Sequence, residues 1–92
     1  MQLRSLVVGN PLGLHARAAA KFARLAGRYA CSVKIARDGR QVDGKSILGL
    51  LVIAAAYGAT IEVSTDGADE VEAIEALSGL VERGFDDGEG QE

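Results

Sequence analysis

Hydrophobic and polar residues alternate along two stretches of the chain, Ser32–Arg37 and Thr60–Thr65. A period of two places alternate side chains on opposite faces of a strand, so the pattern predicts strands with one buried face. Asp38-Gly39 is typical of a two-residue hairpin turn and leads into another short strand. With a β-prone N-terminal run, the predicted strands are Leu3–Val8, Ser32–Arg37, Arg40–Val42 and Thr60–Thr65.

Apolar residues recur at helical spacing in two other segments, and a third segment is apolar almost throughout. In the first segment, positions 19, 22, 23 and 26 define one face that we expect to be buried. The apolar run, Ile47–Ala59, predicts a buried helix with Ser46 as its N-cap and Gly58 at its end. The predicted helices are Ala16–Gly27, Ile47–Gly58 and a segment that starts at Asp69-Glu70 and closes at Gly84.

The predicted order of elements is β-α-β-β-α-β-α, without an internal repeat or a linker. Because strands joined by a two-residue turn are antiparallel, we expect a four-stranded, largely antiparallel sheet. The predicted fold class is α+β, an open-faced sandwich in which three helices cover one face of the sheet. Lys34, Glu62 and Ser64 are expected on the other, solvated face. Residues 1–84 form this single domain, and the acidic residues 85–92 are expected to be a disordered tail.

Composition limits the kind of site that the chain can build. The 92 residues are 48% hydrophobic and 4% aromatic, enough for one small core but too few to wall a deep cofactor cleft. The net charge of −3 gives no general attraction to nucleic acid or anionic lipid. Cys31 is the single cysteine, and the N-terminus lacks a signal-peptide pattern. We therefore expect a cytoplasmic protein. The apolar run is shorter than the roughly 20 residues of a bilayer span, so no direct membrane insertion is expected.

His15, the single histidine, stands between a loop and the predicted helix Ala16–Gly27. Free N–H groups and the dipole at a helix N-terminus attract anions, and the guanidinium of Arg17 can bind phosphate oxygens. A neutral imidazole nitrogen is also a good nucleophile near pH 7. Position alone is also explained by a surface N-cap residue that takes no part in chemistry. With one His and one Cys, no metal site is expected, and no cofactor is needed.

The same helix carries a basic stripe, which consists of Arg17, Lys21, Arg24 and Arg28. Spacings of four, three and four residues keep these side chains on one narrow face of a helix. In a chain of negative net charge, the stripe indicates a docking surface for an acidic partner. An ordinary solvated helix face is the alternative.

Two motifs resemble those of the histidine-containing phosphocarrier (HPr) family of the bacterial phosphoenolpyruvate-dependent phosphotransferase system. Asn10–Ala19 (NPLGLHARAA) is similar to the active-site segment, and Gly44–Leu50 (GKSILGL) to the segment around a regulatory serine. The resemblance runs from Leu3 to about Gly84. It implies that His15 accepts a phosphoryl group on Nδ1, giving pros-phosphohistidine, with assistance from Arg17. The implied donor is Enzyme I, and the implied acceptors are sugar-specific or regulatory proteins.

The resemblance also implies where partners dock, namely on the first helix and the apolar helix. The expected docking residues are Lys21, Arg24, Arg28, Ile47, Leu48 and Leu51, with Leu14 as a further candidate. Many family members have proline where this chain has Ala18, a position at which alanine keeps the backbone N–H. The protein is expected to be a monomeric carrier and not itself an enzyme.

The sequence leaves two interpretations of Ser46 open. A helix N-cap is sufficient reason for a serine there. In some members of the family a dedicated kinase, or kinase/phosphorylase, modifies this serine, and the alternative function is a regulatory protein-binding module controlled through Ser46. An RNA-binding module has little support, because two Tyr and two Phe provide no stacking platform. The sugar-transport and nitrogen-regulatory branches are not distinguished.

Overall fold

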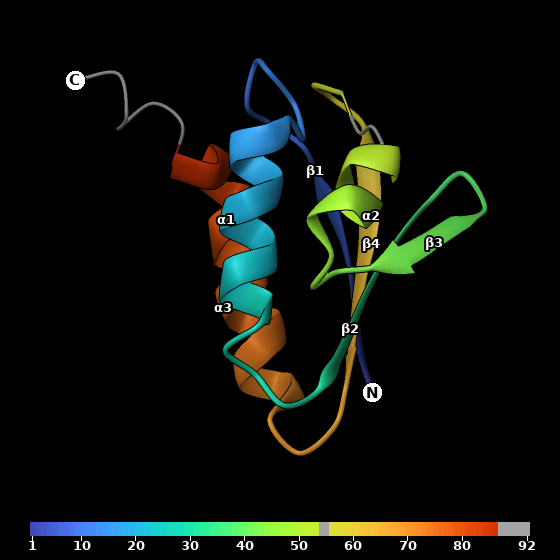
Figure 1. Ribbon diagram of the computed structural model, residues 1–92, viewed down its shortest axis with the longest axis vertical. Helices are drawn as coiled ribbons and strands as arrows, with labels where there is room; N and C mark the ends of the chain where they lie inside the picture. Colours follow the sequence, from blue (N-terminus) through green and yellow to red (C-terminus); the bar gives the residue numbers. More distant parts are fainter. Residues whose placement is uncertain (54–55, 87–92) are drawn as a thin grey trace.

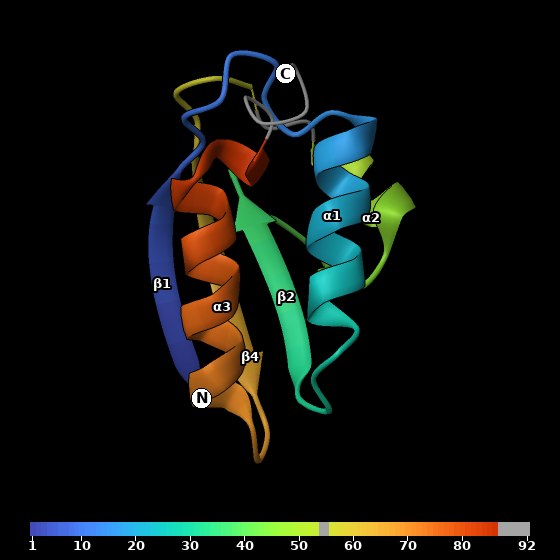
Figure 2. The same ribbon diagram turned by 90° about the vertical axis from the view of Figure 1, so that its left-hand side faces the viewer.

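The computed structural model describes residues 1–53 and 56–86, which form two layers, a sheet and a set of helices (Figure 1). The elements in chain order are β1 (Gln2–Val7), α1 (Ala16–Ala26), β2 (Ser32–Arg37), β3 (Arg40–Asp43), α2 (Ile47–Ile53), β4 (Thr60–Asp66) and α3 (Glu70–Glu82). Figure 2 shows α1 and α3 side by side over the same face of the sheet. The predicted βαββαβα order and α+β class are therefore confirmed.

The sheet has the strand order β1-β4-β2-β3, and all of its pairs are antiparallel. Ile35 lies opposite Val63, and Leu6 lies opposite Ile61, so the apolar side chains of three strands share one face. All four are buried under the helices. The opposite face carries Lys34 and Glu62, both exposed, as the alternation predicts.

The β2–β3 hairpin turns through Asp38-Gly39. Both residues have left-handed backbone, with φ of 52° at Asp38 and 80° at Gly39. Two successive positive φ angles match the right-handed twist of the flanking strands, and aspartate and glycine tolerate this conformation best. The local sequence therefore favours this turn.

The core lies between the sheet and the inner faces of α1 and α3. The four positions predicted to face inward from α1, Ala19, Phe22, Ala23 and Ala26, are all buried. Phe22 is fully buried and fills space between the layers, and α1 packs against both α2 and α3. Gly27 is the C-cap of this helix, as predicted.

The apolar helix α2 differs from its prediction in both length and burial. The structure describes it as Ile47–Ile53, and the segment from Ala56 to Gly58 is not helical, so the predicted end at Gly58 is wrong. Residues 54–55, which the prediction included, lie outside the described residues. Only Leu50 and Ile53 are buried. The other side of this seven-residue helix faces solvent, because α2 packs against α1 and the β2–β3 hairpin on one side only. Within the described chain, no helix has the length and apolarity to cross a membrane.

The predicted disordered tail starts too early. Phe85 is fully buried and belongs to the core, and Asp86 is half-buried. Gly84, Phe85 and Asp86 have φ of 68°, 59° and 59°, so three left-handed residues turn the chain back against the helices. Burial of the Phe85 ring explains why this segment is folded, since the apolar contacts offset the backbone strain at the left-handed positions. Residues 87–92 lie outside the described part of the chain.

Glu70 ties the N-terminus to the first turn of α3. Its carboxylate accepts a hydrogen bond from the backbone N–H of Gly67 at 3.0 Å. It also lies 2.8 Å from the N-terminal ammonium of Met1, and Gln2 Nε2 donates to it at 3.3 Å. These contacts, the Gly67 bond foremost, lower the pKa of Glu70 to about 2.

Replacing Glu70 with glutamine is expected to lower the free energy of unfolding near neutral pH. A carboxyl with a depressed folded-state pKa stabilises the fold above its unfolded value, and this contribution disappears as pH falls through the folded value. The gap between wild type and Glu70→Gln should therefore shrink below the ordinary pKa of 4.5 and close near pH 2. Urea denaturation across this range measures it. Glu72→Gln, in the same first turn, is the control; an equal gap there, or one independent of pH, would contradict the assignment.

Candidate functional site

His15 is the N-cap of α1, with extended backbone at φ −85° and ψ −178°. Its side chain is half-buried, and Nδ1 accepts a hydrogen bond from the backbone N–H of Arg17 at 3.2 Å. In a neutral imidazole the acceptor nitrogen is the unprotonated one, so this hydrogen bond favours the tautomer with its lone pair on Nδ1. The same N–H group belongs to the first turn of the helix, where backbone donors have no intrahelical partner.

The loop before His15 is held by a small hydrogen-bond network around Asn10. Asn10 is 3% exposed, and its Nδ2 donates to the carbonyl oxygen of Gly13 at 2.7 Å. The backbone N–H of Gly13 donates to the Asn10 carbonyl at 3.0 Å, and the N–H of His15 donates to the Gly13 carbonyl at 2.9 Å. Gly13 has φ of 68°, which glycine adopts without strain. The network fixes the direction in which His15 enters the helix.

Asn10 holds the loop before His15, a role that the sequence analysis does not assign to it. An asparagine in a turn can hydrogen-bond backbone groups a few residues away, and Asn10 followed by Pro11 and Gly13 carried that signal. Leu14, by contrast, is predicted as a docking residue but does not lie on the surface. It is 5% exposed and packs in the core, so its prediction as a docking residue is wrong.

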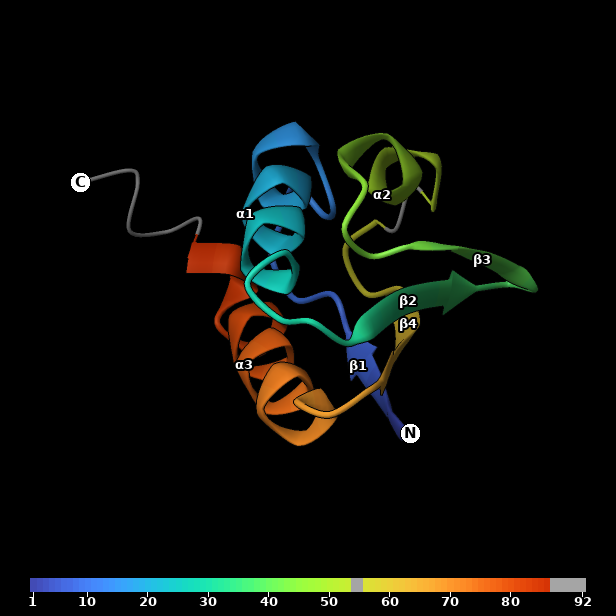
Figure 3. The same cartoon turned by 60° about the horizontal axis from the view of Figure 1, so that its bottom comes forward.

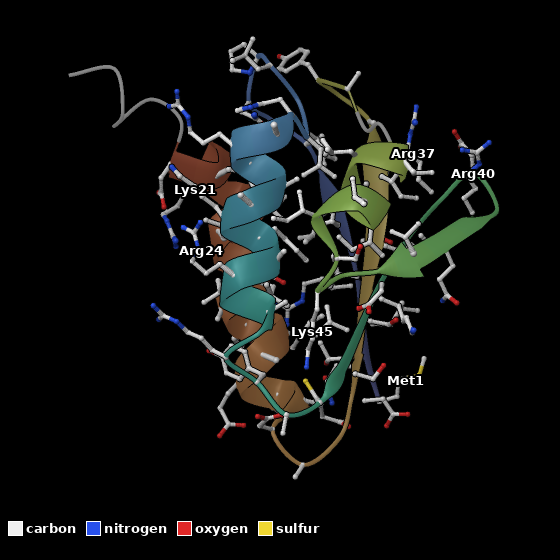
Figure 4. The ribbon with its side chains drawn as sticks, in the orientation of Figure 1. Met1, Lys21, Arg24, Arg37, Arg40 and Lys45 are labelled. Carbon is white, nitrogen blue, oxygen red and sulfur yellow. The ribbon has the colours of Figure 1, made fainter. Side chains whose placement is uncertain are left out.

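The basic stripe faces away from the core, but its members are not equivalent. Arg28 lies beyond Ala26, the last residue of α1, so the prediction that one helix carries all four is wrong for this residue. Arg17, Arg24 and Arg28 are exposed, whereas Lys21 is half-buried. Lys21 Nζ lies 2.9 Å from the carbonyl oxygen of Phe85, to which it donates, and 3.5 Å from that of Asp86. Figure 4 shows Lys21 and Arg24 on the side of α1 toward the segment that follows α3. Lys21 thus stabilises the end of the fold in addition to its place in the stripe.

Ser46 caps α2. Its Oγ accepts a hydrogen bond from the backbone N–H of Gly49 at 3.0 Å, and its carbonyl accepts from Leu50 at 3.0 Å. Nζ of the neighbouring Lys45 donates to the carbonyl oxygen of Tyr29 at 2.7 Å. The predicted cap is confirmed, and Lys45 joins the start of α2 to the end of the α1 region.

Replacing Ser46 with alanine is expected to lower the free energy of unfolding by about 1 kcal/mol, because the Gly49 N–H loses its acceptor. Ser46→Asn is the matched control, since an asparagine side chain also accepts at an N-cap, and it should recover most of this loss. Urea denaturation at pH 7 measures both variants. Equal stability of the alanine and asparagine variants would contradict a capping role.

An apolar patch adjoins α1 on the surface of α2. It consists of Ile47, Leu48, Leu51 and Val52, which are 44%, 76%, 37% and 55% exposed. Figures 1 and 3 show α2 beside α1, and the two helices pack together. The structure therefore brings the expected apolar docking residues and the helix that begins at His15 onto neighbouring elements.

The described part of the chain was also considered for grouped metal ligands and for a reactive thiol. Among residues 1–53 and 56–86, no three His, Cys, Asp or Glu side chains are grouped to hold a metal ion. Cys31 is 2% exposed, and burial raises the pKa of its thiol. A buried, protonated thiol is a poor nucleophile.

The fold and the site together define a class of protein, a small α+β sandwich that presents one histidine at a helix N-terminus. A family model described as the PTS HPr component phosphorylation site matches residues 3–83. The chain belongs to the HPr family of phosphocarrier proteins of the phosphotransferase system.

Individual relatives agree with this assignment. Phosphocarrier protein HPr of Cupriavidus necator is 49% identical over 89 residues, which are 97% of this chain and 100% of the relative. The HPr-like protein Crh of Halalkalibacterium halodurans is 45% identical over 71 residues, covering 77% of this chain and 84% of the relative. The crystal structure of HPr-C-His from Thermoanaerobacter tengcongensis superposes with a TM-score of 0.90 at 35% identity, covering 92% of this chain and 96% of the other.

Proposed function

We propose that His15 is the residue through which this phosphocarrier works, with Nδ1 as the atom that receives the phosphoryl group. The Nδ1–P bond forms as the bond between phosphorus and the donor protein breaks. The donor is Enzyme I, charged by phosphoenolpyruvate, and a sugar-specific or regulatory protein then takes the group from His15. The chain acts as a substrate and donor for these partners and not as an enzyme.

The observation that carries the proposal is the hydrogen bond from the Arg17 N–H to His15 Nδ1. It directs the lone pair of the ring toward the N-terminus of α1, where a helix attracts negative charge. Once Nδ1 is bonded to phosphorus, the Arg17 N–H is placed to donate to a phosphoryl oxygen instead. The exposed guanidinium of Arg17 adds a positive charge beside the same group.

The test is phosphorylation with phosphoenolpyruvate and purified Enzyme I. Wild type is expected to gain one acid-labile phosphate that mass spectrometry, at neutral or alkaline pH, places on His15. His15→Ala should gain none, whereas Ser46→Ala should be labelled like wild type. Labelling of His15→Ala under the same conditions would contradict the proposal.

The exposed arginines of the basic stripe are proposed to steer an acidic partner to His15. Replacing Arg24 and Arg28 with glutamine is expected to raise the KM for phosphorylation by Enzyme I about three- to tenfold at low salt, with kcat nearly unchanged. Lys34→Gln with Arg40→Gln removes the same charge from exposed positions on the sheet and the hairpin, and is the control. Equal changes in the two double variants would contradict a specific docking role.

A regulatory role through Ser46 is the second candidate, and the similarity to an HPr-like protein Crh favours it. Ser46 is half-buried at the start of α2, next to the exposed Ile47 of the apolar patch, so a phosphate there would add negative charge at the docking surface. Mass spectrometry of the protein from its own cells tests this. Stable phosphate on Ser46 with no acid-labile phosphate on His15 would favour the regulatory module.

A monomeric, cytoplasmic carrier remains the expectation.

A further inference from the structure

A groove between α1 and the end of α3 carries much of the positive charge of the basic stripe. Lys21, Arg24, Leu25, Arg28, Leu80 and Asp86 line it, and its volume is about 200 Å³. Three of these residues are cationic, and the carboxylate of Asp86 is the acidic side chain among them. Asp86 Oδ1 accepts from Arg83 Nε at 2.9 Å.

The described part of the chain ends at this groove. The buried ring of Phe85 anchors the segment after α3, and Lys21 Nζ binds the Phe85 carbonyl at 2.9 Å. Figures 1 and 3 show this segment beside α1. Asp86, the last described residue, thus lies among the cations of the groove.

The sequence that follows has the charge that the groove attracts. Residues 87–92 (DGEGQE) contain three acidic side chains and no basic one. Six residues reach up to about 20 Å when extended. Lys21 and Arg17 are four residues apart on α1, about 6 Å along the helix axis, so the acidic segment can reach the whole stripe.

We propose that residues 87–92 bind the basic stripe and compete there with acidic partner proteins. A segment tethered at the edge of its binding site has a high effective concentration, so a weak contact is enough to occupy the site for part of the time. Its effect is to slow association, because the partner must displace it before docking. The kinetic consequence rests on the proposed function, whereas the contact itself does not.

The test neutralises the segment in the full-length chain with Asp87→Asn, Glu89→Gln and Glu92→Gln. The control neutralises three exposed acids elsewhere, Asp38→Asn, Glu62→Gln and Asp66→Asn, and gives the same net charge. Phosphorylation by Enzyme I is followed at an ionic strength of about 0.02 M and again at about 0.5 M, where exposed charges are screened. Backbone amide shifts of α1 are recorded by NMR without any partner.

In the tail variant, the KM for phosphorylation is expected to fall about two- to fivefold at low salt, with kcat unchanged and the difference lost at high salt. Amide shifts of Lys21, Arg24 and Arg28 should change in the tail variant and stay as in wild type in the control. Unchanged α1 shifts, or equal KM values for the two triple variants, would overturn the proposal. If wild type itself takes no phosphate, the proposed function fails, and the amide shifts alone decide the contact.

Discussion

Replacing His15 with asparagine is expected to abolish phosphoryl transfer while leaving the fold intact. An asparagine side chain can accept the Arg17 N–H hydrogen bond that Nδ1 accepts, so the N-cap of α1 is kept. The amide has no nucleophilic nitrogen, and loss of a nucleophile reduces the rate of covalent chemistry by about 10⁴-fold or more. Enzyme I labelling measures the first effect, and urea denaturation the second.

The comparison with His15→Ala separates the two roles of this residue. Both variants should fail to accept phosphate, but the alanine variant also loses the cap and should be about 1 kcal/mol less stable than the asparagine variant. Phosphate uptake by His15→Asn at a rate near wild type would show that another residue is the acceptor.

Replacing Phe85 with alanine is expected to lower the free energy of unfolding by about 3–5 kcal/mol. Phe85 is fully buried, so truncation removes its apolar contacts and leaves a cavity near the end of α3. The loss is large for a domain of this size, whose total stability is on the order of 5–10 kcal/mol. Urea denaturation of full-length protein at pH 7 gives the value.

Asp86→Asn is the control for this variant, because it alters the next residue without removing apolar volume. Its effect should stay below about 1 kcal/mol, since the Arg83–Asp86 ion pair lies near the surface. A change in stability of that same small size for Phe85→Ala would mean that the ring is not part of the folded core.

The strands and the two caps could be predicted because local chemistry determines them. The alternation around Ile35 and the positive φ angles of Asp38-Gly39 are properties of a few consecutive residues. The same holds for His15 and Ser46, each of which is a side chain that accepts a hydrogen bond from the helix it precedes.

The end of α2 and the burial of Phe85 could not be predicted in this way. The run from Ile47 is apolar on every side, so its periodicity does not tell which residues meet solvent or where the helix stops. Phe85 is an isolated aromatic residue in an acidic, glycine-containing stretch, and only packing against distant parts of the chain buries it. Composition correctly indicates the polarity of that stretch but not the exception within it.

In the candidate site, too, some features follow from local sequence and others depend on packing between distant parts of the chain. The position of His15 follows from the sequence, whereas the role of Lys21 depends on where the chain returns after α3, more than sixty residues later. The spacing of the basic residues alone predicts four equivalent cations on one helix face. The fold makes one of them a structural contact and leaves three exposed.

The apolar patch on α2 also bears on how fast a carrier can work. Under the proposed function, donor and acceptor need the same histidine and therefore cannot be bound at the same time. Each cycle includes a dissociation step, and long residence on either partner would delay the next transfer. A patch of four side chains on a seven-residue helix offers little area to a partner, and small contacts release quickly. The short α2 thereby favours rapid exchange between partners over tight binding to either one.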